Sequence, residues 1–433
     1  MAENREINIH VPVLARVEGE GALDIAIRDG HIADLKLRIY EPPRLFEKFL
    51  EGRDYNEVPD MVARICGICP VAYQMSAVHA LESIFGAQPS PWVRAMRRVL
   101  YCGEWMESHS LHIHLLAAPD FLGYDNAIAM ARDYPDEVRR GLRLQGLGNA
   151  IIRLFGGRSV HPVGVRVGGF YRAPDQQDVS ALLDKLRAAL PDAEALVAWT
   201  GSLNLPQDDQ SFTSVALRHP DEYPMNEGRI VSSAGLDILV AEYEHHFREF
   251  QVPHSTALHS LLHDQPYLVG PLARLNLNLD RLPEQVTRAL QATGIAFPSR
   301  NMFHSIVARA IEVYYALSEA VRLLEGYEYP SAPCVPVVPH AGVGYGCTEA
   351  PRGILWHRYE TDDTGRIMIA RIVPPTSQNQ ARIEEDLRRS LDAFGLANSD
   401  EDLRRRAETV IRNYDPCISC ATHFLKLTVR DYP

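Results

Sequence analysis

Alternating hydrophobic and polar positions occur near both ends of the chain and predict antiparallel strands there. Residues 7–40 alternate in two runs around Asp29-Gly30, a dipeptide typical of a tight hairpin turn. Residues 344–379 repeat the pattern around an Asp-Asp-Thr-Gly turn. We therefore expect a β hairpin close to each terminus, with Glu18 in a glycine-containing turn of the first and Arg352 entering the second.

The segment between the hairpins carries hydrophobic residues at three- and four-residue steps, the spacing of amphipathic helices. The ranges with this spacing are 71–85, 91–118, 136–155, 175–203, 282–293 and 300–327. Long helices that are not coiled coils usually pack as a bundle. Residues 221–267 show no clear period and predict no element.

The predicted fold class is α+β, mainly α, with a core of long bundled helices and flanking antiparallel β hairpins. We expect one domain over residues 1–433. Its parts are an N-terminal β unit with a first helix at 1–53, a helical core at 54–330, and a β hairpin with the C-terminal segment at 331–433.

Composition and charge limit the classes of function. Of 433 residues, 46% are hydrophobic and 23% are charged, as in globular proteins. No apolar run approaches the roughly 18–20 residues that cross a bilayer, and the N-terminus has no apolar signal region. The formal net charge of −12 argues against nucleic acid or an anionic membrane as the main partner. We expect a cytoplasmic protein, because the cysteine usage fits a reducing compartment.

Two Cys-x-x-Cys pairs carry the chemistry: Cys66 with Cys69, and Cys417 with Cys420. Two intervening residues let both sulfurs of a pair face one metal, and four soft thiolates suit zinc, iron or nickel. The pairs of a zinc ribbon are commonly about 15–20 residues apart, whereas nearly the whole chain separates these two. A complete fold must therefore form before the metal has its ligands. A structural zinc site that joins the two ends is one interpretation.

Both pairs, in this order and near the two ends, resemble those of the large, catalytic subunit of nickel–iron hydrogenases, in particular the soluble NAD(P)-linked bidirectional group. Further segments of that family occur here in the same order: Arg16–Gly19, Phe46-Glu47, Gly52-Arg53, Gly156–Arg158, His161-Pro162 and Glu349–Gly353. The resemblance is weakest between residues 172 and 299. It implies reversible heterolytic splitting of H2 into protons and electrons.

The resemblance also implies a ligand set for a nickel–iron centre. Cys66 and Cys417 would bind nickel alone, while Cys69 and Cys420 would bridge nickel and iron. The iron of this family carries carbon monoxide and cyanide ligands. No further set of cysteines in the chain could hold an iron–sulfur cluster.

Proton handling is expected at Glu18, Cys417 and Arg352. Taken alone, Glu18 is a solvated turn carboxylate and Arg352 a surface or ion-pair residue. By resemblance, Cys417 takes the proton from H2 and passes it to Glu18. Arg352 lies over the open face of the metals and positions the reactants, with Asp415 as its carboxylate partner; Asp120 is the other carboxylate considered for that role.

A magnesium ion, or Fe2+, is the second metal that the resemblance implies. Its ligands would be Glu47, a backbone carbonyl close to Ile372, and His423. Without the resemblance, Glu47 is an ordinary surface glutamate of a helix. A peptidase trims precursors of this family directly after the matching histidine. Residues 424–433 are therefore either removed on maturation or retained as a plain tail.

Other residues are expected around the metals. His109 and His112 lie three apart on a predicted helix, a spacing that could bind a metal but more often marks hydrogen-bonded core residues. By resemblance, the helix of His109 packs against the metal site, and Pro351 and Ser377 lie near the metals and the diatomic ligands. Tyr73 stands where many relatives have histidine.

The resemblance implies several partners: an iron–sulfur small subunit, diaphorase or NAD(P)-binding subunits, a maturation peptidase and nickel chaperones. Two alternatives share this fold. A hydrogen sensor would retain the metals but turn over slowly. The quinone-binding subunit of respiratory complex I lacks the four cysteines, so their presence argues against it.

Overall fold

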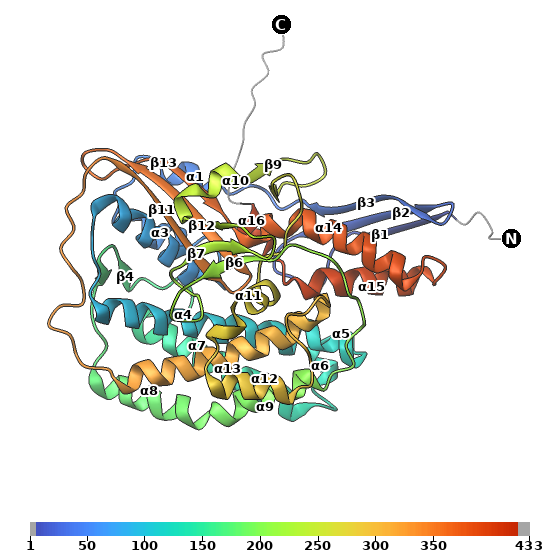
Figure 1. Ribbon diagram of the computed structural model, residues 1–433, viewed down its shortest axis with the longest axis horizontal. Coiled ribbons are helices and arrows are strands. Elements are labelled where there is room, and N and C mark those ends of the chain that lie inside the picture. Colours follow the sequence, from blue (N-terminus) through green and yellow to red (C-terminus); the bar gives the residue numbers. More distant parts are fainter. Residues whose placement is uncertain (1–5, 423–433) are drawn as a thin grey trace, which may run out of the picture.

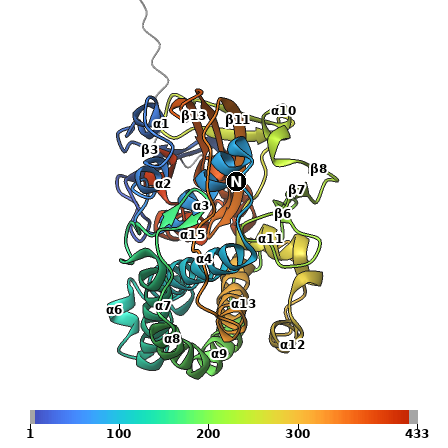
Figure 2. The same cartoon turned by 90° about the vertical axis from the view of Figure 1, so that its left-hand side faces the viewer.

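The computed structural model describes residues 6–422, which form a layer of long helices beneath a layer of sheets (Figure 1). The lower layer contains α4 (Pro91–Leu111), α7 (Pro135–Gly156), α8 (Gln176–Ala188), α9 (Leu190–Gly201) and α13 (Ser305–Glu325). Helix α4 packs against α7 and α13, and α13 packs against α9. Figure 2 shows these helices gathered on one side of the molecule. The predicted class, α+β and mainly α, is confirmed.

Two of the predicted helices are divided into shorter elements near a proline. The run 175–203 is divided into α8 and α9, with Pro191 in the first turn of α9, where its missing N–H costs no hydrogen bond. The run 91–118 was expected as one helix. It is α4, then a π-helical turn at His112–Ala117, then α5 (Ala118–Leu122). Pro119 cannot donate into the preceding turn, which explains the change of helix type.

The N-terminal sheet confirms the first predicted β unit. Strands β1 (Ile7–Val11), β2 (Gly21–Arg28) and β3 (His31–Ile39) pair antiparallel in that order, and β2 and β3 are joined at Asp29-Gly30. The connection between β1 and β2 holds Glu18. Two short helices follow, α1 (Phe46–Leu50) and α2 (Val58–Val62).

The second β unit has three strands rather than the predicted hairpin. Strands β12 (Gly353–Thr361) and β13 (Ile367–Val373) form the hairpin, and β11 (Gly342–Ala350) pairs with the outer side of β12. Strand β11 packs on α3 (Pro70–Phe85). A side chain at Gly346 would lie 2.0 Å from the carbonyl oxygen of Ser76, so glycine lets the strand approach the helix closely.

The region without a clear period, 221–267, contains four short strands, β7 to β10, and the short helix α10. The remaining strands are β4 (Val165–Arg166), β5 (Gly169–Phe170), β6 (Val215–Arg218), β7 (Arg229–Ser232), β8 (Asp237–Ile238), β9 (Phe247–Phe250) and β10 (His259–Leu262). The remaining helices of four or more residues are α6 (Ala127–Met130), α10 (Tyr243–His246), α11 (Pro271–Asn278), α12 (Glu284–Ala292), α14 (Pro375–Phe394), α15 (Asp400–Asn413) and α16 (Ile418–Ala421). Across residues 6–422, no helix combines the length and apolar character needed to traverse a bilayer.

Candidate metal centre

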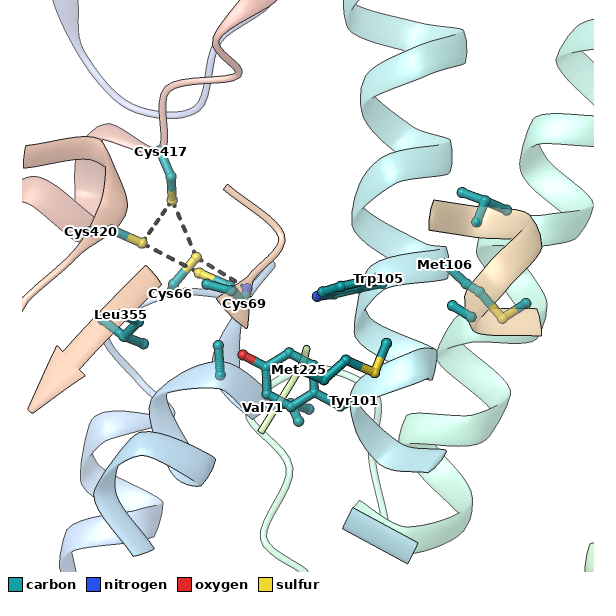
Figure 3. Close-up of a cluster of buried hydrophobic side chains, with 14 of the residues drawn as sticks. Cys66, Cys69, Val71, Tyr101, Trp105, Met106, Met225, Leu355, Cys417 and Cys420 are labelled. Atoms are coloured by element: carbon teal, nitrogen blue, oxygen red, sulfur yellow. Dashed lines mark hydrogen bonds between the residues drawn. The ribbon is translucent and has the colours of Figure 1, made fainter. Parts of the chain in front are cut away.

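The four cysteines of the two pairs meet in one buried cluster. The sulfur of Cys66 lies 3.3 Å from that of Cys417, and the sulfur of Cys69 lies 3.5 Å from that of Cys420. Each of the four sulfurs is within 4.8 Å of the other three. Figure 3 shows them turned toward one another beside the aromatic side chains of α4. All four are free thiols, so this group can offer four sulfur ligands.

Two helix starts position the sulfurs. Cys69 is the N-cap residue of α3, and Cys417 is the N-cap residue of α16. The backbone N–H groups of Ile68 and Cys69 both donate to the sulfur of Cys66, at 3.3 Å each. Such donors favour a thiolate, which is the form that binds metal. The first pair thus lies directly before α3, the helix that the sequence predicts over 71–85.

The loop before β2 joins the two ends of the chain. The carbonyl of Glu18 accepts a 3.0 Å hydrogen bond from the N–H of Ile418. Gly19 has φ = 90°, and a side chain there would lie 2.6 Å from Ile418. Only glycine fits this close approach. Arg44 adds a second link, because its guanidinium donates to the carbonyls of Ile65 and Ser419.

The four thiols affect one another's pKa values. Hydrogen bonds from Cys417, Cys420 and Cys69 lower the pKa of Cys66 well below its ordinary value. Donation to Cys420 and Cys66 raises the pKa of Cys417 well above it. One thiolate therefore forms readily and opposes ionisation of its neighbours. A cation held by the sulfurs would remove that repulsion, so the donor set fits a cluster of metal ions.

Glu18 contacts the cluster directly. Its carboxylate oxygen Oε2 lies 3.1 Å from the sulfur of Cys417 and accepts a 3.0 Å hydrogen bond from the N–H of Ser419. The hydroxyl of Ser419 donates to the other oxygen, Oε1. The residue as a whole is half-buried. Ser419 was not singled out from the sequence, and its only signal is its position inside the second pair.

Arg352 and Asp415 form an ion pair beside the cluster. Nη2 of Arg352 donates to Oδ1 of Asp415 at 3.0 Å, and Nε donates to the Asp415 carbonyl at 2.6 Å. Both residues are 3% exposed. Burial would lower the pKa of Arg352, but Asp415 and the cysteine thiolates raise it well above its ordinary value. Asp120 was the other carboxylate considered for Arg352; it instead binds Arg16 and Arg412.

Two of the residues expected to bind magnesium, Glu47 and Ile372, lie next to each other. The N–H of Ile372 donates to the carboxylate of Glu47 at 2.8 Å. This contact joins α1 to strand β13, which are 325 residues apart in sequence. His423 lies outside the described residues.

His109 belongs to a buried polar network rather than to the sulfur cluster. Its Nε2 lies 2.9 Å from Oε2 of Glu312, and Arg274 donates to both Glu312 and Glu349. Burial lowers the pKa of His109 to about 4, so the imidazole is neutral near pH 7. Its expected role as a hydrogen-bonded core residue is confirmed. His112 likewise contacts the backbone carbonyl of Arg412 at 2.8 Å.

Pro351 lies next to this network, and Ser377 lies in the first turn of α14. The carbonyl of Pro351 accepts a 3.3 Å hydrogen bond from Arg274. Ser377 is 1% exposed, and its hydroxyl has no hydrogen-bond partner within residues 6–422. A buried hydroxyl without a partner is costly, so it fits a polar ligand that completes the centre. Its neighbour Thr376 accepts a hydrogen bond from the N–H of Cys417 at 3.1 Å.

A mainly helical fold that buries four thiols from its two ends, with an arginine and a carboxylate beside them, defines a thiolate-bound metalloprotein. Residues 44–140 and 261–423 match the family described as nickel-dependent hydrogenase. The chain belongs to this family.

The relatives named here cover nearly the full length of the chain. It is 32% identical to sulfhydrogenase 2 subunit alpha of Pyrococcus furiosus, over 97% of this chain and 100% of that protein. It is 27% identical to the NAD-reducing hydrogenase HoxS subunit beta of Cupriavidus necator, over 95% of this chain and 94% of that one. A crystal structure of an NAD+-reducing [NiFe]-hydrogenase superposes with a TM-score of 0.87 at 28% identity, covering 96% of this chain and 99% of that one.

Proposed function

We propose that this chain is the catalytic large subunit of a nickel–iron hydrogenase, which splits H2 reversibly into protons and electrons. The observation that carries the proposal is the meeting of four free, buried thiols within 4.8 Å of one another. The chain's membership of the nickel-dependent hydrogenase family supports nickel and iron as the occupants.

The ligand roles follow the family pattern. Cys66 and Cys417 would hold nickel alone, and Cys69 and Cys420 would bridge it to iron, which carries carbon monoxide and cyanide. These metals would supply the Lewis-acid and redox chemistry that polarises H2. The unpartnered hydroxyl of Ser377 is available to donate to a diatomic ligand.

Cys417 and Glu18 move the proton. A proton released from H2 is taken by the sulfur of Cys417, which lies 3.1 Å from Oε2 of Glu18. That distance allows direct transfer to the carboxylate. The hydroxyl and N–H of Ser419 hold the carboxylate in this orientation. Because Glu18 is half-buried, it can release the proton outward.

Arg352 positions the reactants rather than acting as the base. Two hydrogen bonds to Asp415 fix the guanidinium, and its raised pKa keeps it charged. A fixed positive charge next to the sulfurs stabilises thiolates and negative charge that develops during the reaction.

A magnesium ion, or Fe2+, is proposed at Glu47, with the backbone carbonyl near Ile372 and His423 as further ligands. The contact between Glu47 and Ile372 supports their shared site. The family match ends at residue 423, which supports processing after His423 by a maturation peptidase once nickel chaperones have delivered the metal.

Electrons would leave through an iron–sulfur small subunit and then reach NAD(P) through diaphorase subunits. Two relatives described as NAD-reducing support this coupling. A cytoplasmic location stays a prediction from the cysteine usage. We propose a single domain over 1–433, because one hydrophobic core includes residues from β1 to α16.

The test is metal analysis and infrared spectroscopy of the chain purified with its partner subunits. We expect about one nickel and one iron in the centre per chain, bands of carbon monoxide and cyanide, and H2-dependent reduction of NAD or NADP. Zinc alone, without those bands, would favour the structural zinc site instead.

A further inference from the structure

A second group of metal-ligating side chains lies outside the cysteine cluster. His254 lies in the loop between β9 and β10, His259 is the first residue of β10, and Glu384 belongs to α14. One ligand atom from each lies within 4.8 Å of the others. Glu384 is eight residues beyond Thr376 on α14, or about 12 Å along the helix at 1.5 Å per residue. The group is therefore separate from the sulfurs.

The spacing of the three side chains fits a single ion. Nε2 of His254 lies 2.8 Å from Oε1 of Glu384, and Nε2 of His259 lies 3.5 Å from Oε2. Around a tetrahedral zinc ion, bonds of about 2.0–2.2 Å place neighbouring ligand atoms roughly 3.4 Å apart. The two observed separations lie on either side of that value, so small side-chain shifts would complete the arrangement.

His259 is the clearest sign of a missing partner. The residue is 2% exposed, and neither ring nitrogen has a hydrogen-bond partner within residues 6–422. A buried polar group without a partner costs about 1–3 kcal/mol. The ring is packed against Phe250, with ring centroids 5.6 Å apart, and faces Glu384. A cation between the imidazole and the carboxylate would give Nε2 a strong partner.

The surrounding backbone holds the ligands in place. The N–H of Leu37 in β3 donates to Oε1 of Glu384 at 2.9 Å. The N–H of Thr256 donates to the carbonyl of Ile39 at 2.8 Å and fixes the loop between the two histidines. Such supporting bonds are typical of metal sites.

The site is open on one side. The side chains of His254 and Glu384 are 19% and 18% exposed, in contrast to that of His259. His254 lines a surface cavity of about 470 Å³ between the end of β3 and the 251–256 loop. The cavity therefore brings solvent, and ions dissolved in it, to His254.

We propose that His254, His259 and Glu384 bind a divalent transition-metal ion of the zinc class. Two imidazoles and one carboxylate favour zinc and related ions over magnesium, which prefers oxygen ligands. The bound ion would tie the 254–259 segment to α14, whose first turn supports Cys417 through Thr376. This site is independent of the proposed hydrogenase activity.

The test uses the purified complex loaded with nickel and iron, so that zinc cannot fill the cysteine cluster. The complex is dialysed against Zn2+ with a competing chelator, and bound zinc, nickel and iron are measured per chain. We expect one zinc per chain in the wild type. His254→Gln and Glu384→Gln should weaken zinc binding at least ~10–100-fold, as loss of even an outer partner of a ligand does, and nickel and iron should stay unchanged.

His259→Gln should have the same effect, but this buried variant can misfold, so the two half-exposed positions carry the test. His245→Gln, on an exposed neighbouring histidine, is the matched control and should retain zinc. Zinc should also raise the Tm of the wild type but not that of His254→Gln. Absence of bound zinc, or equal binding by wild type and both half-exposed variants, would overturn the proposal.

Discussion

The cysteine cluster has two unlike flanks. On one flank the half-buried carboxylate of Glu18 contacts the sulfur of Cys417 and is held by Ser419. On the other flank Arg352 is fully enclosed and bound twice to Asp415. In the proposed mechanism, Glu18 on the first flank transfers the proton and Arg352 on the second flank supplies a positive charge held in place by Asp415.

The largest expected effect comes from replacing Cys417, one of the four cysteines of the cluster. Cys417→Ser should abolish H2 uptake and nickel retention, because an alcohol is a poor ligand for a soft metal ion. Nickel content and H2 uptake of the purified complex measure this. Cys334→Ser is the control, since Cys334 lies outside the cluster and should be replaceable without loss. A Cys417→Ser variant with full activity would remove this residue from the site.

The proton-exchange flank is tested by Glu18→Gln. The amide retains the shape of the side chain but cannot take a proton from Cys417. We expect normal nickel and iron contents and a rate of H–D exchange lower by about 10²–10⁴-fold, the usual contribution of a positioned acid or base. Glu20→Gln changes an exposed carboxylate of the same turn and should leave exchange unaltered. An unchanged rate in Glu18→Gln would count against the relay.

The fixed-charge flank is tested by Arg352→Lys. Lysine retains the charge but cannot make both hydrogen bonds to Asp415. Loss of one preorganised donor lowers rates by about 10²–10³-fold; because the charge remains, we expect about 10²-fold in H2 uptake, with unchanged nickel. Arg366→Lys, at an exposed arginine, should behave as wild type. If Arg352→Lys retained full uptake while Glu18→Gln did not, the positioning role would be wrong.

The smallest expected effect is on the pH dependence of stability, and it comes from His109 in the buried polar network. The pKa of His109 falls from 6.5 to about 4 because of burial. The unfolded chain thus binds the proton more readily, and stability is lost as pH falls below 6.5. Between pH 7.5 and 5.5 the loss is about 1.4 kcal/mol, the value of one pKa unit.

His109→Gln should reduce that acid-induced loss, measured as the fall in Tm between the two pH values. His31→Gln, at an exposed histidine, is the control. An equal fall in Tm for wild type and His109→Gln would show that His109 is not the titrating group.

Much of the site could be predicted because its parts are local motifs. Each Cys-x-x-Cys pair and the Arg-x-Glu-Gly turn are short segments whose chemistry is visible in the sequence. Their meeting followed from the family resemblance, and it depends on contacts such as that between Gly19 and Ile418, 399 residues apart. The partnership of Arg352 with Asp415 was predicted because Asp415 lies just before the second cysteine pair.

Other features had no local signal. Strand β11 was not distinguished from β12, because the alternating run from residue 344 was assigned to a single hairpin; its glycines allow close packing on α3. The π-helical turn after α4 follows from Pro119, whose effect on helix type cannot be read from periodicity. The partner of His109 is Glu312, 203 residues away, and only the assembled core brings them together.

The central claim is that four sulfurs from opposite ends of the chain jointly hold nickel and iron. X-ray absorption at the nickel edge of the purified complex tests it most directly. We predict a sulfur shell at nickel with an iron atom as the next neighbour, and loss of that signal in Cys417→Ser. Nickel surrounded only by oxygen and nitrogen, or a chain that contains zinc and no nickel, would contradict the account.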